Sequence, residues 1–308
     1  MPAQTQPKSQ PSVLDDLMVL LRQIPIAGYI LIILFAWLYY EPLMVVWRAW
    51  TKDGGYYSHG PLVPFVAAWM LYTQKEVLLT IPHRSSWSGL AILLICSLIF
   101  LVSSLCHMYP PKYVAFVFYL LGFNLLLFGT RMARATLLPW AFLFFMVPLP
   151  DGLIDLITYK LRIAVTATAV SMTEPFNWYV VKSGNYIFFP NGDTLVVGDI
   201  CAGLRSIISL LALGAVFAFL SRLSPFGSIL LFILSAPVAI ITNILRIFAL
   251  IVIAHFWGSE VASGRVHDIS GWAIFVVAFS LLYLCYFLLE KILSKQEPAQ
   301  PAIPEAQP

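Results

Sequence analysis

The sequence predicts an all-α integral membrane protein with about eight transmembrane helices and a small extracytoplasmic cap. Of its 308 residues, 60% are hydrophobic and only 11% are charged, whereas soluble domains carry about 25% charged residues. A chain this apolar cannot cover its surface with polar groups, so its surroundings are lipid. Several apolar stretches also approach the ~20 residues that a helix needs to cross the hydrocarbon core.

Eight stretches have the character of membrane spans. They are residues 26–47, 61–79, 87–106, 113–129, 135–149, 202–220, 226–257 and 272–289. The stretch 226–257 is the longest and contains Pro237. We expect it to cross the membrane once, either tilted or broken at the proline.

The distribution of basic residues in the short loops predicts the orientation. One side holds Lys8, Arg22, Lys75, Arg84, Arg131, Arg134, Arg222, Lys291 and Lys295. Both termini are therefore expected in the cytoplasm. The polar, Pro/Gln-rich residues 1–25 are expected to form a cytoplasmic tail rather than a cleaved signal peptide. Residues 26–290 then form the membrane domain, and residues 291–308 form a disordered cytoplasmic tail.

Residues 151–200 form the longest non-membrane interval and predict the extracytoplasmic cap. In residues 152–172, Leu153, Leu156 and Ile157 recur at helical spacing, which is typical of an amphipathic helix in the membrane interface. Residues 185–197 alternate in polarity around Asn191-Gly192. That dipeptide between two β-prone runs predicts a β-hairpin.

Composition and motifs exclude several classes of function. A net charge of +3 is too small to indicate nucleic-acid binding. The four cysteines show no metal-ligand spacing, so neither a metal nor a cofactor is expected. The chain has no phosphate-binding glycine loop, no His-Glu-x-x-His helix, no paired intramembrane aspartates and no serine elbow. A cysteine is the best nucleophile that remains.

Cys201 is the cysteine with the most reactive surroundings. It lies at the start of a predicted helix, where the helix dipole and the unpaired N–H groups favour a thiolate. Arg205 follows four residues later on the same helix face, and Gly203 leaves space for a peptide. Cys96, Cys106 and Cys285 lie in apolar runs and are expected to be core residues. The same structural interpretation remains open for Cys201.

Arg246 lies within a predicted span. An arginine there is costly and usually faces a partner or a cavity. Asn243 precedes it by three residues and could orient it. The guanidinium could stabilise a thiolate or an oxyanion. The alternative is a structural ion pair with Asp199 or Glu260.

Two polar segments are expected on the outer face with Cys201. His267 stands at the outer end of the last span and could deprotonate a thiol and protonate a leaving amine. Its neighbour Asp268, like Arg205 and Asn243, is also expected to bind substrate, although Asp268 could instead cap that helix. In the first outer loop, Ser58 and His59 could bind substrate or cap the following helix. Together, a thiol, a guanidinium and an imidazole are the parts needed for acyl transfer through a thioester.

Four ordered motifs resemble those of the exosortase/archaeosortase family of membrane-embedded cysteine transpeptidases. They are Tyr-Ser-His-Gly at residues 57–60, Cys-Ala-Gly-Leu-Arg-Ser at 201–206, Asn-Ile-Leu-Arg at 243–246 and His-Asp-Ile-Ser-Gly-Trp at 267–272. The resemblance covers roughly residues 50–289. It implies a catalytic set of Cys201, Arg246 and His267. A histidine at 267 resembles the bacterial exosortase branch, whereas archaeal members tend to carry arginine. Ala202 departs from the more common serine.

The resemblance implies a location and a class of substrate. Family members lie in the bacterial inner membrane and act on exported proteins whose C-terminal sorting signal has a Pro-Glu-Pro-type motif, a transmembrane helix and a basic cluster. Bacterial members occur with exopolysaccharide systems, so the expected partners are such proteins, membrane lipid and a lipid or glycan acceptor. One alternative is a non-enzymatic factor for exopolysaccharide assembly or export. A transporter is a further alternative, although no internal repeat is visible.

Overall fold

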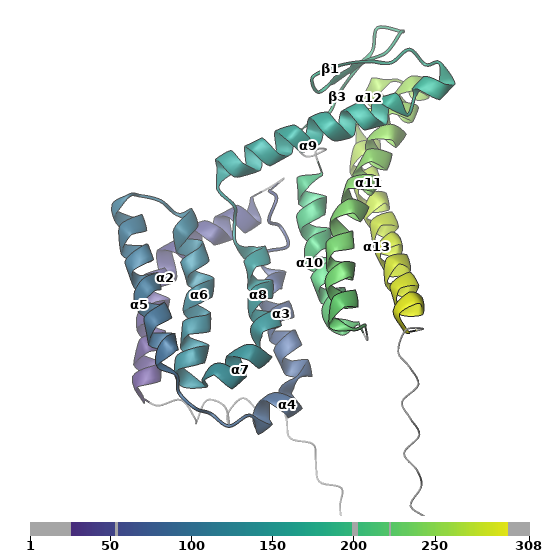
Figure 1. Ribbon diagram of the computed structural model, residues 1–308. Helices are drawn as coiled ribbons and strands as arrows, with labels where there is room; N and C mark the ends of the chain where they lie inside the picture. The colour runs from purple at the N-terminus through teal and green to yellow at the C-terminus, as the bar shows by residue number, and fades with distance from the viewer. Residues whose placement is uncertain (1–25, 53–54, 199–202, 222, 295–308) are drawn as a thin grey trace, which may run out of the picture. The chain divides into compact units, whose positions relative to one another are not determined.

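The computed structural model describes residues 26–52, 55–198, 203–221 and 223–294, without the side chains of residues 27, 265–268 and 294. The described chain is helical apart from one small sheet (Figure 1). It divides into two compact units, Met1–Arg48 with Ala68–Ala141 and Ala49–Ala67 with Phe142–Pro308. The predicted tails, residues 1–25 and 295–308, lie outside the described residues.

The first unit contains most of the helices before residue 142. These are α2 (Ile26–Thr51), α3 (Leu62–Thr73), α4 (Lys75–Thr80), α5 (Trp87–Leu105), α6 (Pro110–Leu127), α7 (Thr130–Ala135) and α8 (Leu137–Phe142), of which α2, α3 and α8 continue into the second unit. Its core is aromatic, with Phe35 and Tyr39 of α2 packed against Phe116 and Tyr119 of α6. A side chain at Gly89 would overlap the α6 backbone, so α5 and α6 can approach closely there.

The second unit contains the remaining elements. These are η1 (Leu143–Met146), α9 (Asp151–Ser171), η2 (Glu174–Phe176), β1 (Val181–Ser183), β2 (Tyr186–Phe188), β3 (Thr194–Val196), α10 (Leu204–Leu220), α11 (Pro225–Trp257), α12 (Ser259–Ser263) and α13 (Arg265–Ser294). Helices α10, α11 and α13 pack side by side, and α9 crosses their ends (Figure 1). The sheet and α12 lie beyond α9, around the end of α11.

The predicted hairpin is present as β2 and β3. The two strands pair antiparallel, with Ile187 opposite Leu195, and Gly192 in the connection has a φ of +88°. Ile187 and Leu195 are buried on one face, whereas Tyr186 and Phe188 are exposed on the other. The sequence analysis missed β1, which pairs with the free edge of β2. Three residues are too short to show a clear alternation.

Helix α11 is one continuous helix of 33 residues. It begins after Ser224, whose side chain accepts a hydrogen bond from the Gly227 amide. From the sequence, we expected this stretch to be either tilted or broken at Pro237. The helix continues through Pro237, so it is not broken there. A membrane helix tolerates an internal proline because neighbouring helices and local adjustments satisfy the freed backbone group.

Five described helices are long and apolar enough to span a membrane. They are Gly28–Thr51, Trp87–Leu105, Pro110–Leu127, Pro225–Trp257 and Ile269–Leu293, and the bent pair Leu137–Met146 with Asp151–Phe176 adds a sixth if it forms one broken span. Leu62–Thr73 and Leu204–Leu220 are apolar but shorter. All eight predicted stretches therefore contain helix. The protein is an integral membrane protein, and the count of eight spans stays a prediction.

Helix α9 buries only part of its predicted apolar face. Ile157 and Leu161 pack against the buried cluster of Tyr57, Ile154 and Leu204. Leu153 and Leu156 are exposed, whereas Ile154, Val165 and Ala169 are buried. The buried residues pack on the rest of the second unit, with Val165 and Ala169 against Ile247, Leu250 and Ile251 of α11. The exposed leucines leave an apolar stripe on the outside, as a helix in the membrane interface requires.

Candidate active site

Every predicted site residue belongs to the second unit. Cys201 itself lies outside the described residues. The backbone of His267 and Asp268 is described, whereas their side chains are not. The described part of the site consists of the residues that flank these positions.

Gly203 joins the start of α10 to the middle of α11. It precedes α10 with a φ of +87°, a left-handed conformation that glycine adopts without strain. A Cβ at this position would lie only 2.5 Å from Nδ2 of Asn243. The backbone two residues after Cys201 is thus in direct contact with the Asn243 amide.

Arg246 is buried one turn further along α11, with 7% of its surface exposed. Its Nε donates a hydrogen bond to the Ser270 hydroxyl of α13 at 3.2 Å. A Cβ on Gly271 would stand 3.6 Å from Nη2 of Arg246. Gly271 follows His267 by four residues, so both positions lie on one face of α13. The structure therefore brings α10, α11 and α13 together at Gly203, Asn243, Arg246 and Gly271.

Ser270 was not among the sequence-predicted site residues. Its signal was a hydroxyl three residues after His267, inside the His-Asp-Ile-Ser-Gly-Trp motif, in which Ser270 was given no role. The helix begins earlier than expected, because α13 starts at Arg265. Asp268 consequently lies in the first turn of α13 and is not its N-cap. Glu260, the described acidic residue considered as a partner of Arg246, is exposed on α12.

The convergence of the three helices lies about one membrane thickness from their other ends. A Cβ on Gly227, near the start of α11, would contact Leu293 near the end of α13. Nineteen residues of α11 separate Gly227 from Arg246, a rise of about 28 Å. The hydrocarbon core is about 30 Å thick. Trp272, 81% exposed beside Gly271, stands where an aromatic anchor at the membrane interface is expected.

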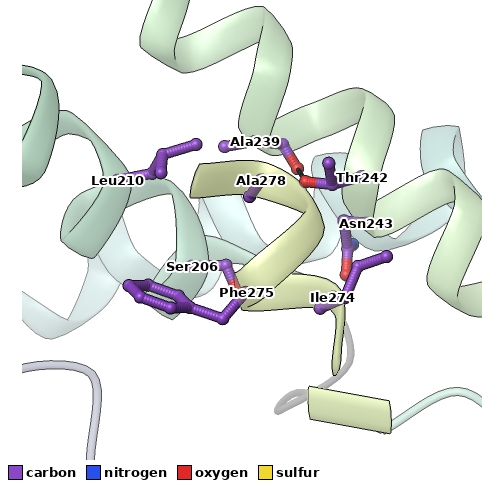
Figure 2. A pocket seen from close by; sticks show the side chains of 8 residues that line it. All are labelled: Ser206, Leu210, Ala239, Thr242, Asn243, Ile274, Phe275 and Ala278. Carbon is purple, nitrogen blue, oxygen red and sulfur yellow. Dashed lines mark hydrogen bonds between the residues drawn. The ribbon is translucent and has the colours of Figure 1, made fainter. Parts of the chain in front are cut away.

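A small cavity opens between α10, α11 and α13 (Figure 2). It is lined by Ser206, Leu210, Ala239, Thr242, Asn243, Ile274, Phe275 and Ala278. Its volume of ≈ 10 Å³ has room for about one water molecule. Thr242 donates back to the Val238 and Ala239 carbonyls of its own helix. Asn243 thus borders both this cavity and Gly203, but the cavity is too small for a peptide.

The segment before α3, which holds the Tyr-Ser-His-Gly motif, is fastened to the rest of the second unit by hydrogen bonds. Arg205 donates from Nη2 to the Gly55 carbonyl at 2.5 Å, and the Tyr57 hydroxyl accepts from the Leu149 amide at 2.8 Å. Trp50 donates to the Met146 carbonyl at 2.9 Å. Arg205 therefore positions this loop, whether or not it also acts on Cys201.

His59 is tied to the same segment. Its Nε2 lies 3.2 Å from the Phe145 carbonyl oxygen, which can only accept, so Nε2 carries the proton. Burial lowers the pKa of His59 below its ordinary 6.5. The Phe145 hydrogen bond opposes this shift, and the Arg205 charge adds to it. His59 is thus a neutral imidazole whose Nδ1 is an acceptor, whereas the neighbouring Ser58 is exposed.

Among the described residues, no group of three or more His, Cys, Asp or Glu side chains could hold a metal ion. The chemistry that this arrangement offers is that of an arginine buried beside the start of α10. Such a guanidinium can stabilise a developing negative charge on a group presented from the loop before α10.

The family model for transmembrane exosortases matches residues 47–284, more than half of the chain. This range contains all four motifs singled out in the sequence. No curated protein and no solved structure gives a significant match.

Proposed function

Because the chain belongs to the transmembrane exosortase family, we propose that it is a cysteine protease or transpeptidase of the bacterial inner membrane. Its substrates would be exported proteins with a C-terminal sorting signal, formed by a Pro-Glu-Pro-type motif, a transmembrane helix and a basic cluster. Cys201 is the nucleophile, Arg246 the charge stabiliser and His267 the proton donor. The site faces the outside of the membrane, and both termini lie in the cytoplasm.

The observation that carries this proposal is the position of Arg246. Its guanidinium lies beside Gly271, one turn of α13 after His267. Asn243, one turn before it, touches Gly203, two residues after Cys201. Gly203 and Gly271, which belong to the Cys201 and His267 motifs, thus contact residues one turn apart on α11, and this supports the proposal. An arginine buried inside an apolar helix bundle is costly, so a functional reason for it is expected.

The chemistry is acyl transfer in two steps. The Cys201 thiolate attacks the scissile carbonyl carbon, and Arg246 stabilises the negatively charged oxygen of the tetrahedral intermediate. The C–N bond then breaks, His267 gives its proton to the departing amine, and a thioester remains on Cys201. Water would resolve the thioester to a free carboxylate. An amine on a lipid or glycan would instead form a new amide.

The membrane supplies part of the substrate binding. A short motif offers few contacts, whereas a sorting helix that packs beside the spans contributes binding energy away from the reacting bond. The lateral surface of the protein is therefore expected to matter for recognition.

The test replaces Cys201 with Ala or Ser in cells that make a tagged exported substrate. Both variants should accumulate the uncleaved substrate. Cys106→Ala is the matched control. Cys106 was expected to be a core residue, but it is exposed at the end of α5, and its loss should leave processing intact. Normal processing by Cys201→Ala would overturn the cysteine assignment and favour the non-enzymatic factor for exopolysaccharide assembly or export. Mass spectrometry of a peptide trapped on Cys201, with and without candidate amines, would identify the acceptor.

A further inference from the structure

The buried face of α9 carries two hydroxyl groups without a hydrogen-bond partner. Thr158 is 3% exposed and Thr166 is fully buried. Neither Oγ1 atom finds a partner, even though a threonine in a helix can bond to its own preceding turn. Thr168 on the same helix does so, because its hydroxyl donates to the Ala164 carbonyl at 3.0 Å. Buried polar groups are nearly always paired, so each of these two hydroxyls needs an explanation.

Both threonines lie on the stretch of α9 whose neighbouring residues pack beside the candidate active site. One turn before Thr158, Ile154 packs with Tyr57 and with Leu204, the residue after Gly203. Beside Thr166, Val165 packs with Ile247, the residue after Arg246. Helix α9 therefore packs against α10 and α11 along the stretch that carries the two threonines (Figure 1).

A third acceptor stands in the same region. Nδ1 of His59 is buried and has no hydrogen-bond partner. His59 neighbours Tyr57, with ring centroids 6.2 Å apart, and Tyr57 belongs to the cluster that holds Ile154. The second unit thus holds two hydroxyls and one imidazole nitrogen with unused hydrogen-bonding capacity.

We propose that Thr158 and Thr166 bind the main chain of the substrate as an extended strand beneath α9, just before the scissile bond reaches Cys201. This inference rests on the proposed function and assigns to it positioning residues that the motifs do not contain. A hydroxyl both donates and accepts, so it fits a peptide group, whose N–H and C=O also need one partner of each kind. Eight residues of helix separate the two threonines by about 12 Å. An extended peptide covers that distance in about four residues.

The test uses Thr158→Val, Thr166→Val and the double variant in the full-length protein. The reporter is a secreted domain followed by Pro-Glu-Pro, an apolar helix of about 20 residues and a basic cluster. Valine keeps the shape of threonine and removes only the hydroxyl. Each lost hydrogen bond should raise KM for the reporter about fivefold and leave kcat within about twofold. Thr168→Val is the matched control, because its hydroxyl is exposed and bonded within α9.

Two further variants separate hydrogen bonding from packing. Thr158→Ser and Thr166→Ser keep the hydroxyl and should retain most of the binding. The valine variants should unfold at the same temperature as the parent or higher, because an unpaired buried hydroxyl is removed. Equal losses in the serine and valine variants would overturn the proposal, since shape alone would then matter. An unchanged KM in the double valine variant would overturn it too, and the hydroxyls would then be merely hydrated or unpaired.

A binding measurement keeps this proposal separate from the proposed chemistry. In the Cys201→Ala background, the intact reporter is captured through its tag and the co-purified protein is quantified. The double valine substitution should lower that capture at least fivefold. If Cys201→Ala still cleaves the reporter, the cysteine mechanism fails, whereas the capture assay still reports on Thr158 and Thr166.

Discussion

The two compact units each bury a cation, and they do so in different ways. In the first unit, Lys112 is 6% exposed, and its ammonium lies over the rings of Phe100 and Tyr109 at 5.2 and 5.0 Å from their centroids. In the second unit, Arg246 is 7% exposed, and it faces the Ser270 hydroxyl and the backbone at Gly271. The lysine is held by an aromatic core, whereas the arginine stands where three helices meet.

The units can also be compared in how they satisfy polar side chains. In the first unit, Ser97 and Tyr119 bond to each other, and Trp140 donates to the Val117 carbonyl at 2.8 Å. In the second unit, buried atoms of His59, Thr158 and Thr166 have no hydrogen-bond partner, and the described part of the first unit also holds two such atoms, the Tyr39 hydroxyl and Asn124 Oδ1. Unpartnered polar groups alone therefore do not separate the two units. We expect the chemistry in the second unit because the four sequence motifs lie there.

The largest expected effect comes from replacing Arg246, and the matched control replaces Lys112, the buried cation of the first unit. Arg246→Lys keeps the charge but loses the forked donor set, so processing of the tagged substrate should fall about 100-fold or more. Lys112→Met removes a buried cation of equal burial in the first unit and should leave processing within about twofold once protein amounts are matched. Equal losses in both variants would erase the distinction between the units.

Gly203→Ala should have the next largest effect. The new Cβ would meet the Asn243 amide at 2.5 Å in a backbone conformation with positive φ, which costs roughly 1–3 kcal/mol. Displacing the segment after Cys201 should reduce processing about tenfold or more. Gly198→Ala is the control, because nothing lies within 4 Å of its Cβ position. Processing rates and thermal unfolding in detergent measure both variants, and a fully active Gly203→Ala would contradict the close contact.

A smaller effect is expected from the pH dependence of His59. Burial lowers the pKa of the folded-state imidazole below 6.5, so the unfolded chain binds the proton first as the pH falls. The stabilisation is therefore present above about pH 6.5 and is lost as the pH drops through the lower folded-state pKa. The unfolding temperature of the parent should fall on acidification more than that of His59→Gln. His83→Gln, at an exposed position of the first unit, should behave as the parent does.

The smallest effect on function is expected in the core of the first unit. Tyr119→Phe removes the hydrogen bond with Ser97 and should lower the free energy of unfolding by about 1 kcal/mol. Processing at permissive temperature should stay within about twofold. Ser97→Ala should behave in the same way, because it removes the other half of the same pair. A specific loss of processing in either variant would show that the first unit takes part in the chemistry.

Features that depend on local sequence were predictable. The apolar stretches identified a membrane protein because their length matches the hydrocarbon core. The β2–β3 hairpin followed from Asn191-Gly192, which suits a tight turn. Arg246 was noticed because a charge inside an apolar span is costly. The ordered motifs indicated the exosortase family, which the family model confirms.

The sequence by itself thus determined the membrane class, the helices and the family. Only the tertiary structure decided that α9 buries Thr158 and Thr166 while Leu153 and Leu156 are exposed, that α13 begins at Arg265, and that Ser270 meets Arg246. It also decided that Gly203 touches Asn243. The physical reason is that these features depend on contacts between helices far apart in the chain. The period of one helix shows that it has an apolar face, but its neighbours choose which face is buried.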